Sequence, residues 1–135
     1  MNSTTKSVYI YFNDGSQNFT TFPVVENASD LEAFDVADMD GDLDMDIILG
    51  YDQFSGDQIV LVKNNGANNF ETINILTSPF SSLSGLKIDD IDGDGKNDVL
   101  AFKNFSCTAF INQGNDTYEG QGVASTSDIV RSIQT

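Results

Sequence analysis

Short apolar stretches recur along the whole chain and are separated by turns rich in Asn, Asp and Gly. They are rich in β-branched and aromatic residues, and no window shows the 3.6-residue period of an amphipathic helix. The clearest stretches cover Val8–Phe12, Phe19–Val25, Leu31–Ala37, Ile47–Tyr51, Ile59–Val62, Phe70–Leu76, Val99–Phe102 and Thr108–Ile111. The pattern predicts an all-β protein of antiparallel hairpins, because Asn and Gly tolerate the positive φ of tight turns.

Two kinds of segment repeat along this pattern. An Asn-x-Gly turn followed by an aromatic residue occurs three times: Asn13 to Gly15 with Phe19, Asn64 to Gly66 with Phe70, and Asn112 to Gly114 with Tyr118. An acidic segment beginning at Asp38 recurs at Asp90, 52 positions later. A tandem unit of about 50 residues with four strands is typical of a propeller blade.

The register of these repeats divides the chain into blades. It predicts a partial blade over residues 1–28, complete blades over 29–78 and 79–124, and the inner strand of a further blade over 125–135, centred on residues 128–133. These tandem four-stranded antiparallel blades amount to fewer than three, whereas propellers close with about four to eight. We therefore expect an open fold unless more chain or another copy completes it.

The two acidic segments place carboxylates at the same loop positions, one, three, five and nine. They are Asp38, Asp40, Asp42 and Asp46 in the first loop and Asp90, Asp92, Asp94 and Asp98 in the second. A hard cation such as Ca²⁺ takes six to eight oxygen ligands, and alternate residues of a tight loop can direct carboxylates at one centre. The backbone carbonyl of position seven, Asp44 or Lys96, is expected to complete the shell. The sequence therefore predicts two Ca²⁺ sites.

Two other interpretations of these loops fit the sequence less well. A helix-loop-helix calcium site requires Glu at position twelve, where Leu49 and Ala101 stand instead. Solvated Asp-Gly turns are common, but the same carboxylate pattern occurring twice at a blade period favours metal binding. The first loop has Leu43 at position six, where the second has Gly95. Because that position favours a positive φ, we expect weaker calcium binding at the first loop.

Composition narrows the classes of function. With 21 Asp plus Glu against six Lys plus Arg, the net charge is −15, which disfavours nucleic acid and anionic membrane surfaces as partners. The chain has no His, and its single Cys107 cannot form an intrachain disulfide. No apolar stretch approaches the ~20 residues that cross a bilayer. Because the clustered carboxylates are assigned to cations, we expect no enzymatic activity.

The acidic loops and Asn-x-Gly hairpins together resemble the FG-GAP and VCBS repeats of integrin-α-type β-propellers. The resemblance covers nearly the whole chain and implies a calcium-stabilised propeller in a secreted or surface protein, used for adhesion or ligand binding. Leu49 to Tyr51 and Ala101 to Lys103 stand where the Gly-Ala-Pro element would fall. This departure favours the VCBS-like bacterial variant over an integrin.

Five Asn residues fit the N-glycosylation pattern: Asn2, Asn18, Asn27, Asn104 and Asn115. Turn composition explains the same pattern, so both interpretations stay open.

An extracellular structural or adhesive module is the favoured function. The expected partners are other copies of the chain, pairing residues 128–133 with the partial blade to form a ring or filament, or the remainder of a larger propeller in a surface protein. A glycan-binding lectin is the alternative, although the chain has no Trp to stack on sugars.

Overall fold

The computed structural model describes residues 5–53, 56–77, 83–103 and 106–125, and over these ranges the protein is all-β with no helix. Consequently, no described helix has the length and apolar character needed to cross a membrane. The strands are β1 (Lys6–Asn13), β2 (Phe19–Ala28), β3 (Leu31–Ala37), β4 (Asp46–Tyr51), β5 (Gln58–Asn64), β6 (Phe70–Thr77), β7 (Leu83–Asp89), β8 (Asp98–Lys103), β9 (Ser106–Gly114) and β10 (Thr117–Ser125).

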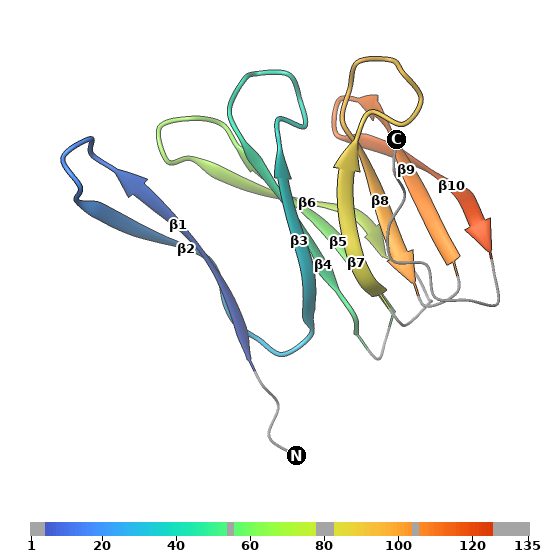
Figure 1. Cartoon of the computed structure of the whole chain (residues 1–135), viewed down its shortest axis with the longest axis horizontal. Helices are drawn as coiled ribbons and strands as arrows, with labels where there is room; N and C mark the ends of the chain where they lie inside the picture. Colours follow the sequence, from blue (N-terminus) through green and yellow to red (C-terminus); the bar gives the residue numbers. More distant parts are fainter. Residues whose placement is uncertain (1–4, 54–55, 78–82, 104–105, 126–135) are drawn as a thin grey trace. The chain divides into compact units, whose positions relative to one another are not determined.

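These strands form three separate sheets, each with its strands in chain order (Figure 1). The hairpin β1-β2 stands alone, whereas β3 to β6 and β7 to β10 make two four-stranded antiparallel sheets. None of the described sheets closes into a barrel. The predicted all-β class and the open, blade-like sheets are therefore confirmed.

The repeated turn sequence makes the same two contacts in all three sheets. In each turn the Asn faces the following aromatic residue across the hairpin: Asn13 faces Phe19, Asn64 faces Phe70, and Asn112 faces Tyr118. The Asn side chain also accepts the N–H of the turn glycine at 2.9, 3.1 and 2.9 Å, respectively. The repeat in sequence is thus a repeat in hydrogen bonding.

The chain divides into two compact units, residues 1–31 and residues 32–135. In the first unit, alternation along β1 leaves Tyr9 and Tyr11 exposed and Ile10 and Phe12 half-buried. The Tyr9 hydroxyl donates to Glu26 Oε1 at 2.8 Å across the hairpin. Such a two-stranded sheet has little apolar surface to bury by itself.

The core of the second unit lies between its two sheets. Ile48 and Leu61 of one sheet pack with Leu83, Val99 and Phe110 of the other. The central strands β4 and β8 are buried on both faces over most of their length, which explains their continuous apolar runs.

Gly50 allows the two sheets to approach closely. A Cβ at this position would lie 2.5 Å from Leu83 Cδ2 and 2.9 Å from Leu86 Cδ1. A larger residue would therefore push β4 away from β7.

Cys107 lies on the second sheet, in an apolar cluster with Leu100, Phe102, Ala109 and Ile111. Its thiol is free and only 1% exposed, and burial raises its pKa. The side chain packs as a small apolar group.

The predicted boundaries at residues 28/29, 78/79 and 124/125 stay predictions. The strand predicted at residues 128–133 lies outside the described part of the chain.

Candidate metal centre

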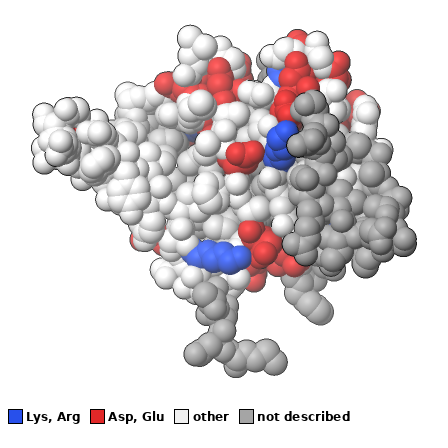
Figure 2. Space-filling model, in the orientation of Figure 1, with Lys and Arg blue, Asp and Glu red and all other residues white. Residues whose placement is uncertain are grey.

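Each acidic loop connects the first strand of a four-stranded sheet to the second, β3 to β4 and β7 to β8 (Figure 1). Acidic side chains gather over both loops (Figure 2). The carboxylates stabilise the turns of their own loops, because short Asp side chains accept backbone N–H groups a few residues further along.

The carboxylate at position one organises the tightest turn of each loop. Asp38 accepts the N–H groups of Gly41 at 2.7 Å and Leu43 at 3.0 Å. The second loop repeats these bonds at corresponding positions, from Gly93 at 2.8 Å and Gly95 at 3.0 Å to Asp90.

The carboxylates at positions three and five make a second matched set of bonds. Each accepts the N–H two residues further along. The donor and acceptor pairs are Asp42 to Asp40 at 3.1 Å, Asp44 to Asp42 at 2.9 Å, Asp94 to Asp92 at 3.1 Å and Lys96 to Asp94 at 2.9 Å.

Position six has different residues in the two loops but the same backbone conformation. Leu43 has a φ of 75° and Gly95 a φ of 87°, so both occupy the left-handed region. This conformation suits Gly but costs a residue with a Cβ roughly 1–2 kcal/mol. The backbone conformation expected at this position is therefore present, and Leu43 adopts it while its side chain is 89% exposed.

The carboxylates at position nine are fully buried, with 0% exposure for both Asp46 and Asp98. Asp46 accepts the N–H groups of Met39 and Asn64, both at 2.8 Å. Burial raises the pKa of Asp46, and the charges of other loop carboxylates raise it further.

Asp98 makes the matching bonds in the second loop, from Ile91 at 2.9 Å and Asn112 at 2.8 Å. Each ninth carboxylate thus joins the start of its loop to the third strand of its own sheet.

Two groups of carboxylates converge closely enough to hold a metal ion. One is Asp38, Asp40 and Asp42, and the other is Asp90, Asp92 and Asp98; within each group the ligand oxygens lie within 4.8 Å of one another. An all-oxygen, anionic donor set suits a hard cation. Six of the predicted ligands are therefore brought together in two groups, which do not include Asp46 and Asp94.

Position seven differs in its side chain. Lys96 forms an ion pair with Asp94, which lowers the pKa of Asp94 and raises that of Lys96. The Lys96 side chain therefore engages a predicted ligand, whereas only its backbone carbonyl was expected to take part. Asp44 occupies position seven of the first loop, where an acidic side chain cannot form the corresponding ion pair.

A second lysine, Lys63 of β5, was missed in the sequence. Its Nζ lies 2.9 Å from Asp40 Oδ2 and 3.4 Å from Asp116 Oδ2. The Asp40 hydrogen bond raises the pKa of Lys63, and the same contact lowers the pKa of Asp40. One sequence feature could have indicated this role: Lys63 directly precedes the repeated Asn64, whereas Ile111 precedes Asn112 in the second repeat.

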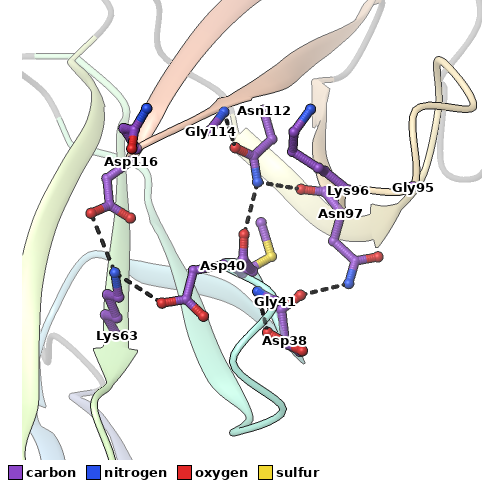
Figure 3. Close-up of a pocket in the computed structure, with 12 residues that line it drawn as sticks. Asp38, Asp40, Gly41, Lys63, Gly95, Lys96, Asn97, Asn112, Gly114 and Asp116 are labelled. Carbon is purple, nitrogen blue, oxygen red and sulfur yellow. Dashed lines mark hydrogen bonds and ion pairs between the residues drawn. The ribbon is translucent and has the colours of Figure 1, made fainter.

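Two Asn side chains connect the first loop to the second sheet. Asn97 Nδ2 donates to Asp38 O at 2.7 Å, and Asn112 Nδ2 donates to Met39 O at 2.8 Å and to Asn97 O at 3.1 Å. These contacts border a cavity of about 350 Å³ that also includes Lys63 and Asp116 in its lining (Figure 3). The two loops are therefore parts of one polar assembly.

Residues 38–101 match the FG-GAP-like repeat. The match spans the first loop, the rest of its sheet and the second loop into β8, and it supports an FG-GAP-like repeat in this stretch. No curated protein and no solved structure matches the chain significantly.

Among the predicted glycosylation sites, Asn18, Asn27 and Asn115 are exposed, while Asn2 and Asn104 lie outside the described residues. Glycosylation at these positions stays a prediction.

Proposed function

We propose that the chain is a calcium-stabilised, extracellular structural or adhesive module of the β-propeller type, closer to VCBS repeats than to integrins. One observation carries this proposal: the two acidic loops share both their carboxylate positions and their backbone hydrogen bonds. The shared network holds several negative charges together in each loop. Without a cation this arrangement is costly because of like-charge repulsion.

Calcium fits the donor set better than other common metals. The candidate ligands are all carboxylates, and the chain has no His for zinc, copper or nickel. Magnesium demands a near-ideal octahedral shell and keeps several of its waters, so it uses fewer protein carboxylates than each loop offers. Asp38, Asp40 and Asp42 would hold one ion and Asp90, Asp92 and Asp98 the other, where each ion would offset the carboxylate charge.

Calorimetric titration of the chelator-treated protein tests this function. We expect two Ca²⁺ sites, with Mg²⁺ giving weaker binding, and a higher melting temperature when Ca²⁺ is added. Asp38→Asn with Asp90→Asn should abolish the response to Ca²⁺, whereas Asp30→Asn serves as a control outside the loops. A parent protein that binds no Ca²⁺ would show the proposal to be wrong.

The isolated hairpin β1-β2 supports an assembly role. Within the described residues β1 pairs only with β2, so the edge of β1 away from β2 is not joined to another described strand. We propose that strands from another copy, or from the remainder of a larger propeller, complete this sheet by β-augmentation. Light scattering coupled to size-exclusion chromatography should show oligomers, and Val8→Pro in β1 should reduce them.

Carbohydrate binding is the second candidate function, favoured by the polar cavity between the two loops. Its amide, ammonium and carboxylate groups match the donors and acceptors of sugar hydroxyls. Glycan-array binding that is lost in Asn115→Ala would support this function over a purely structural one. We assign no catalytic role to the loop carboxylates.

A further inference from the structure

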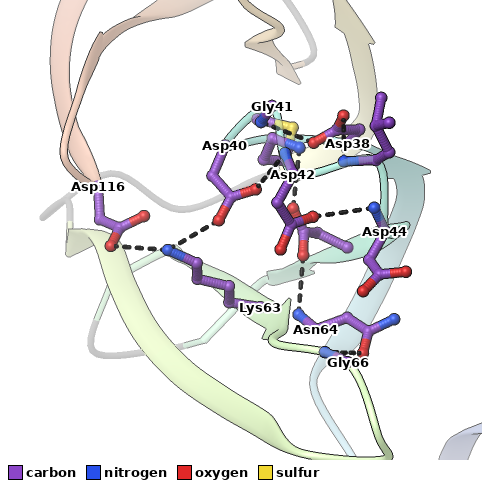
Figure 4. A network of polar contacts seen from close by, with 12 residues as sticks. Asp38, Asp40, Gly41, Asp42, Asp44, Lys63, Asn64, Gly66 and Asp116 are labelled. Atoms are coloured by element: carbon purple, nitrogen blue, oxygen red, sulfur yellow. Dashed lines mark hydrogen bonds and ion pairs between the residues drawn. The ribbon is translucent and has the colours of Figure 1, made fainter.

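Lys63 lies between two carboxylates that belong to different sheets (Figure 4). It comes from β5, whereas Asp40 belongs to the first acidic loop and Asp116 to the turn between β9 and β10. The side chains of Lys63, Asp40 and Asp116 are only 18%, 20% and 31% exposed. The ammonium group is thus partly shielded from water, and its interaction with each carboxylate is correspondingly stronger than at an open surface.

Asp40 is also one of the three candidate ligands of the first loop. Its Oδ1 accepts the N–H of Asp42 and its Oδ2 contacts Lys63 Nζ, so both oxygens already have partners. A cation entering this loop must share Asp40 with an ammonium group held a few ångströms away.

We propose that Lys63 is a tethered competitor for the cation at the first loop, and that calcium binding there weakens the Lys63 link to Asp40 while leaving the link to Asp116. This inference rests on the proposed calcium function and adds a control element to it. In the metal-free protein Lys63 offsets the charge of Asp40 and Asp116. In the metal-bound protein the same positive charge repels the divalent ion.

Among the described residues, no lysine of a neighbouring strand reaches the second loop as Lys63 reaches the first. Asn64 and Asn112 donate corresponding N–H groups to Asp46 and Asp98, which places Ile111 at the position equivalent to Lys63. The lysine of the second loop, Lys96, comes from the loop itself, and its side chain is 43% exposed. Water and salt screen that ion pair more strongly. Within the part of the chain that the structure describes, competition by a partly buried ammonium is therefore expected at the first loop and not at the second.

Removal of the Lys63 charge is expected to change the calcium affinity and the stability of the metal-free protein in opposite directions. Removing the Lys63 charge should raise the calcium affinity of the first loop roughly 5- to 50-fold, on the order expected for a unit charge near a divalent ion at a partly shielded site. The same substitution should lower the melting temperature of the metal-free protein, because Asp40 and Asp116 lose their counter-charge.

The test uses the full chain carrying Asp92→Asn, so that calcium binding reports mainly on the first loop. Lys63→Met is compared with Lys63→Arg, which keeps the charge, and with Lys87→Met. The last variant removes a different ammonium, one that pairs with Asp89 at 2.7 Å and is 39% exposed. Calorimetry gives the affinity, and melting in excess chelator gives the metal-free stability.

The expected result is tighter calcium binding and lower metal-free stability in Lys63→Met, with both quantities near the parent values in Lys63→Arg. Lys87→Met should change the affinity less than about three-fold, as expected for an exposed charge. If Lys63→Met does not fold without metal, Lys63→Gln supplies the same comparison with a polar side chain.

Two failures are distinguishable. If the parent and its Asp92→Asn form bind calcium but Lys63→Met and Lys63→Gln leave the affinity unchanged or lower it, the inference about Lys63 is wrong and the calcium function stands. If neither the parent nor its Asp92→Asn form binds calcium, the proposed function itself is wrong and the inference falls with it.

Discussion

The two acidic loops share their hydrogen bonds from backbone N–H groups to carboxylates but differ in other residues within and around them. Position one binds positions four and six in both loops, and position nine is buried in both. The differences are Leu43 against Gly95, Asp44 against Lys96, and Lys63 against Ile111 on the neighbouring strand. The Asp pattern therefore accounts for the shared loop conformation, whereas we expect residues between and beyond the Asp positions to set any difference in cation affinity.

The largest expected effect comes from the buried ninth carboxylates. Asp46→Ala and Asp98→Ala each leave two backbone N–H groups without their acceptor, so each should lower the free energy of unfolding by about 3–5 kcal/mol. Asp98 belongs to a converging carboxylate group and Asp46 does not. Asp98→Ala should therefore cost more calcium affinity at its own loop than Asp46→Ala does. Equal losses in calorimetry would contradict this difference.

The opposite end of the sheet pair provides a metal-independent comparison. Lys103 Nζ lies 3.4 Å from Asp57 Oδ2, and the Asp57 side chain is only 2% exposed. Lys103→Met leaves a buried carboxylate without this counter-charge and should lower the free energy of unfolding by about 2–3 kcal/mol at neutral pH. Chemical denaturation should give the same loss with and without calcium. If calcium abolished this loss of stability, the Lys103–Asp57 pair would not be independent of the acidic loops.

The same variant has an expected pH dependence. Burial raises the pKa of Asp57 and Lys103 opposes that rise, so removal of Lys103 should raise the pKa further. A carboxyl whose folded-state pKa is raised destabilises the fold when ionised, that is, at pH values above its unfolded value of 3.8. The deficit of Lys103→Met should therefore shrink as the pH falls through the raised folded pKa of Asp57. A deficit that grows over this range would contradict the assignment.

A smaller effect is expected at position six. Leu43→Gly relieves the cost of a Cβ at positive φ and should raise the free energy of unfolding by about 1 kcal/mol, together with the calcium affinity of the first loop. Gly95→Ala should have the opposite effects at the second loop. Urea denaturation with and without calcium measures both, and a destabilising Leu43→Gly would show that the Leu side chain contributes contacts that outweigh the backbone cost.

The smallest effect is expected for Lys96. Its side chain is 43% exposed and pairs with Asp94, which is not in the converging group. Lys96→Met should change the calcium affinity of the second loop less than about three-fold, because exposed ion pairs contribute little. A change as large as that of Lys63→Met would remove the distinction between the two lysines.

Much of the fold could be predicted because its signals are local. The Asn-x-Gly turns and the apolar stretches gave the hairpins, and the structure extends these strands by a few residues, as in Lys6–Asn13 and Asp98–Lys103. The convergence of Asp38, Asp40 and Asp42 followed from their alternation within one loop.

The contacts that escaped prediction join residues far apart in the chain. Lys63 meets Asp40 and Asp116, and Asn112 meets Met39, only because two sheets pack side by side. A repeat pattern predicts what each sheet has in common with the next, whereas these contacts arise where one sheet meets the other. The ion pair between Lys96 and Asp94 escaped prediction for another reason, because only the backbone carbonyl of Lys96 was expected to take part in the site.

The burial of Cys107 gives the protein an internal reporter. A thiol that is 1% exposed and has a raised pKa reacts with a disulfide reagent only while its surroundings are open. The rate of thiol labelling therefore reports how often the second sheet opens around Cys107, without any substitution in the protein. An ion at the second loop would hold the first two strands of that sheet together. Labelling of Cys107 should therefore be slower with calcium than without it, and the ratio of the two rates gives the effect of the ion on local opening.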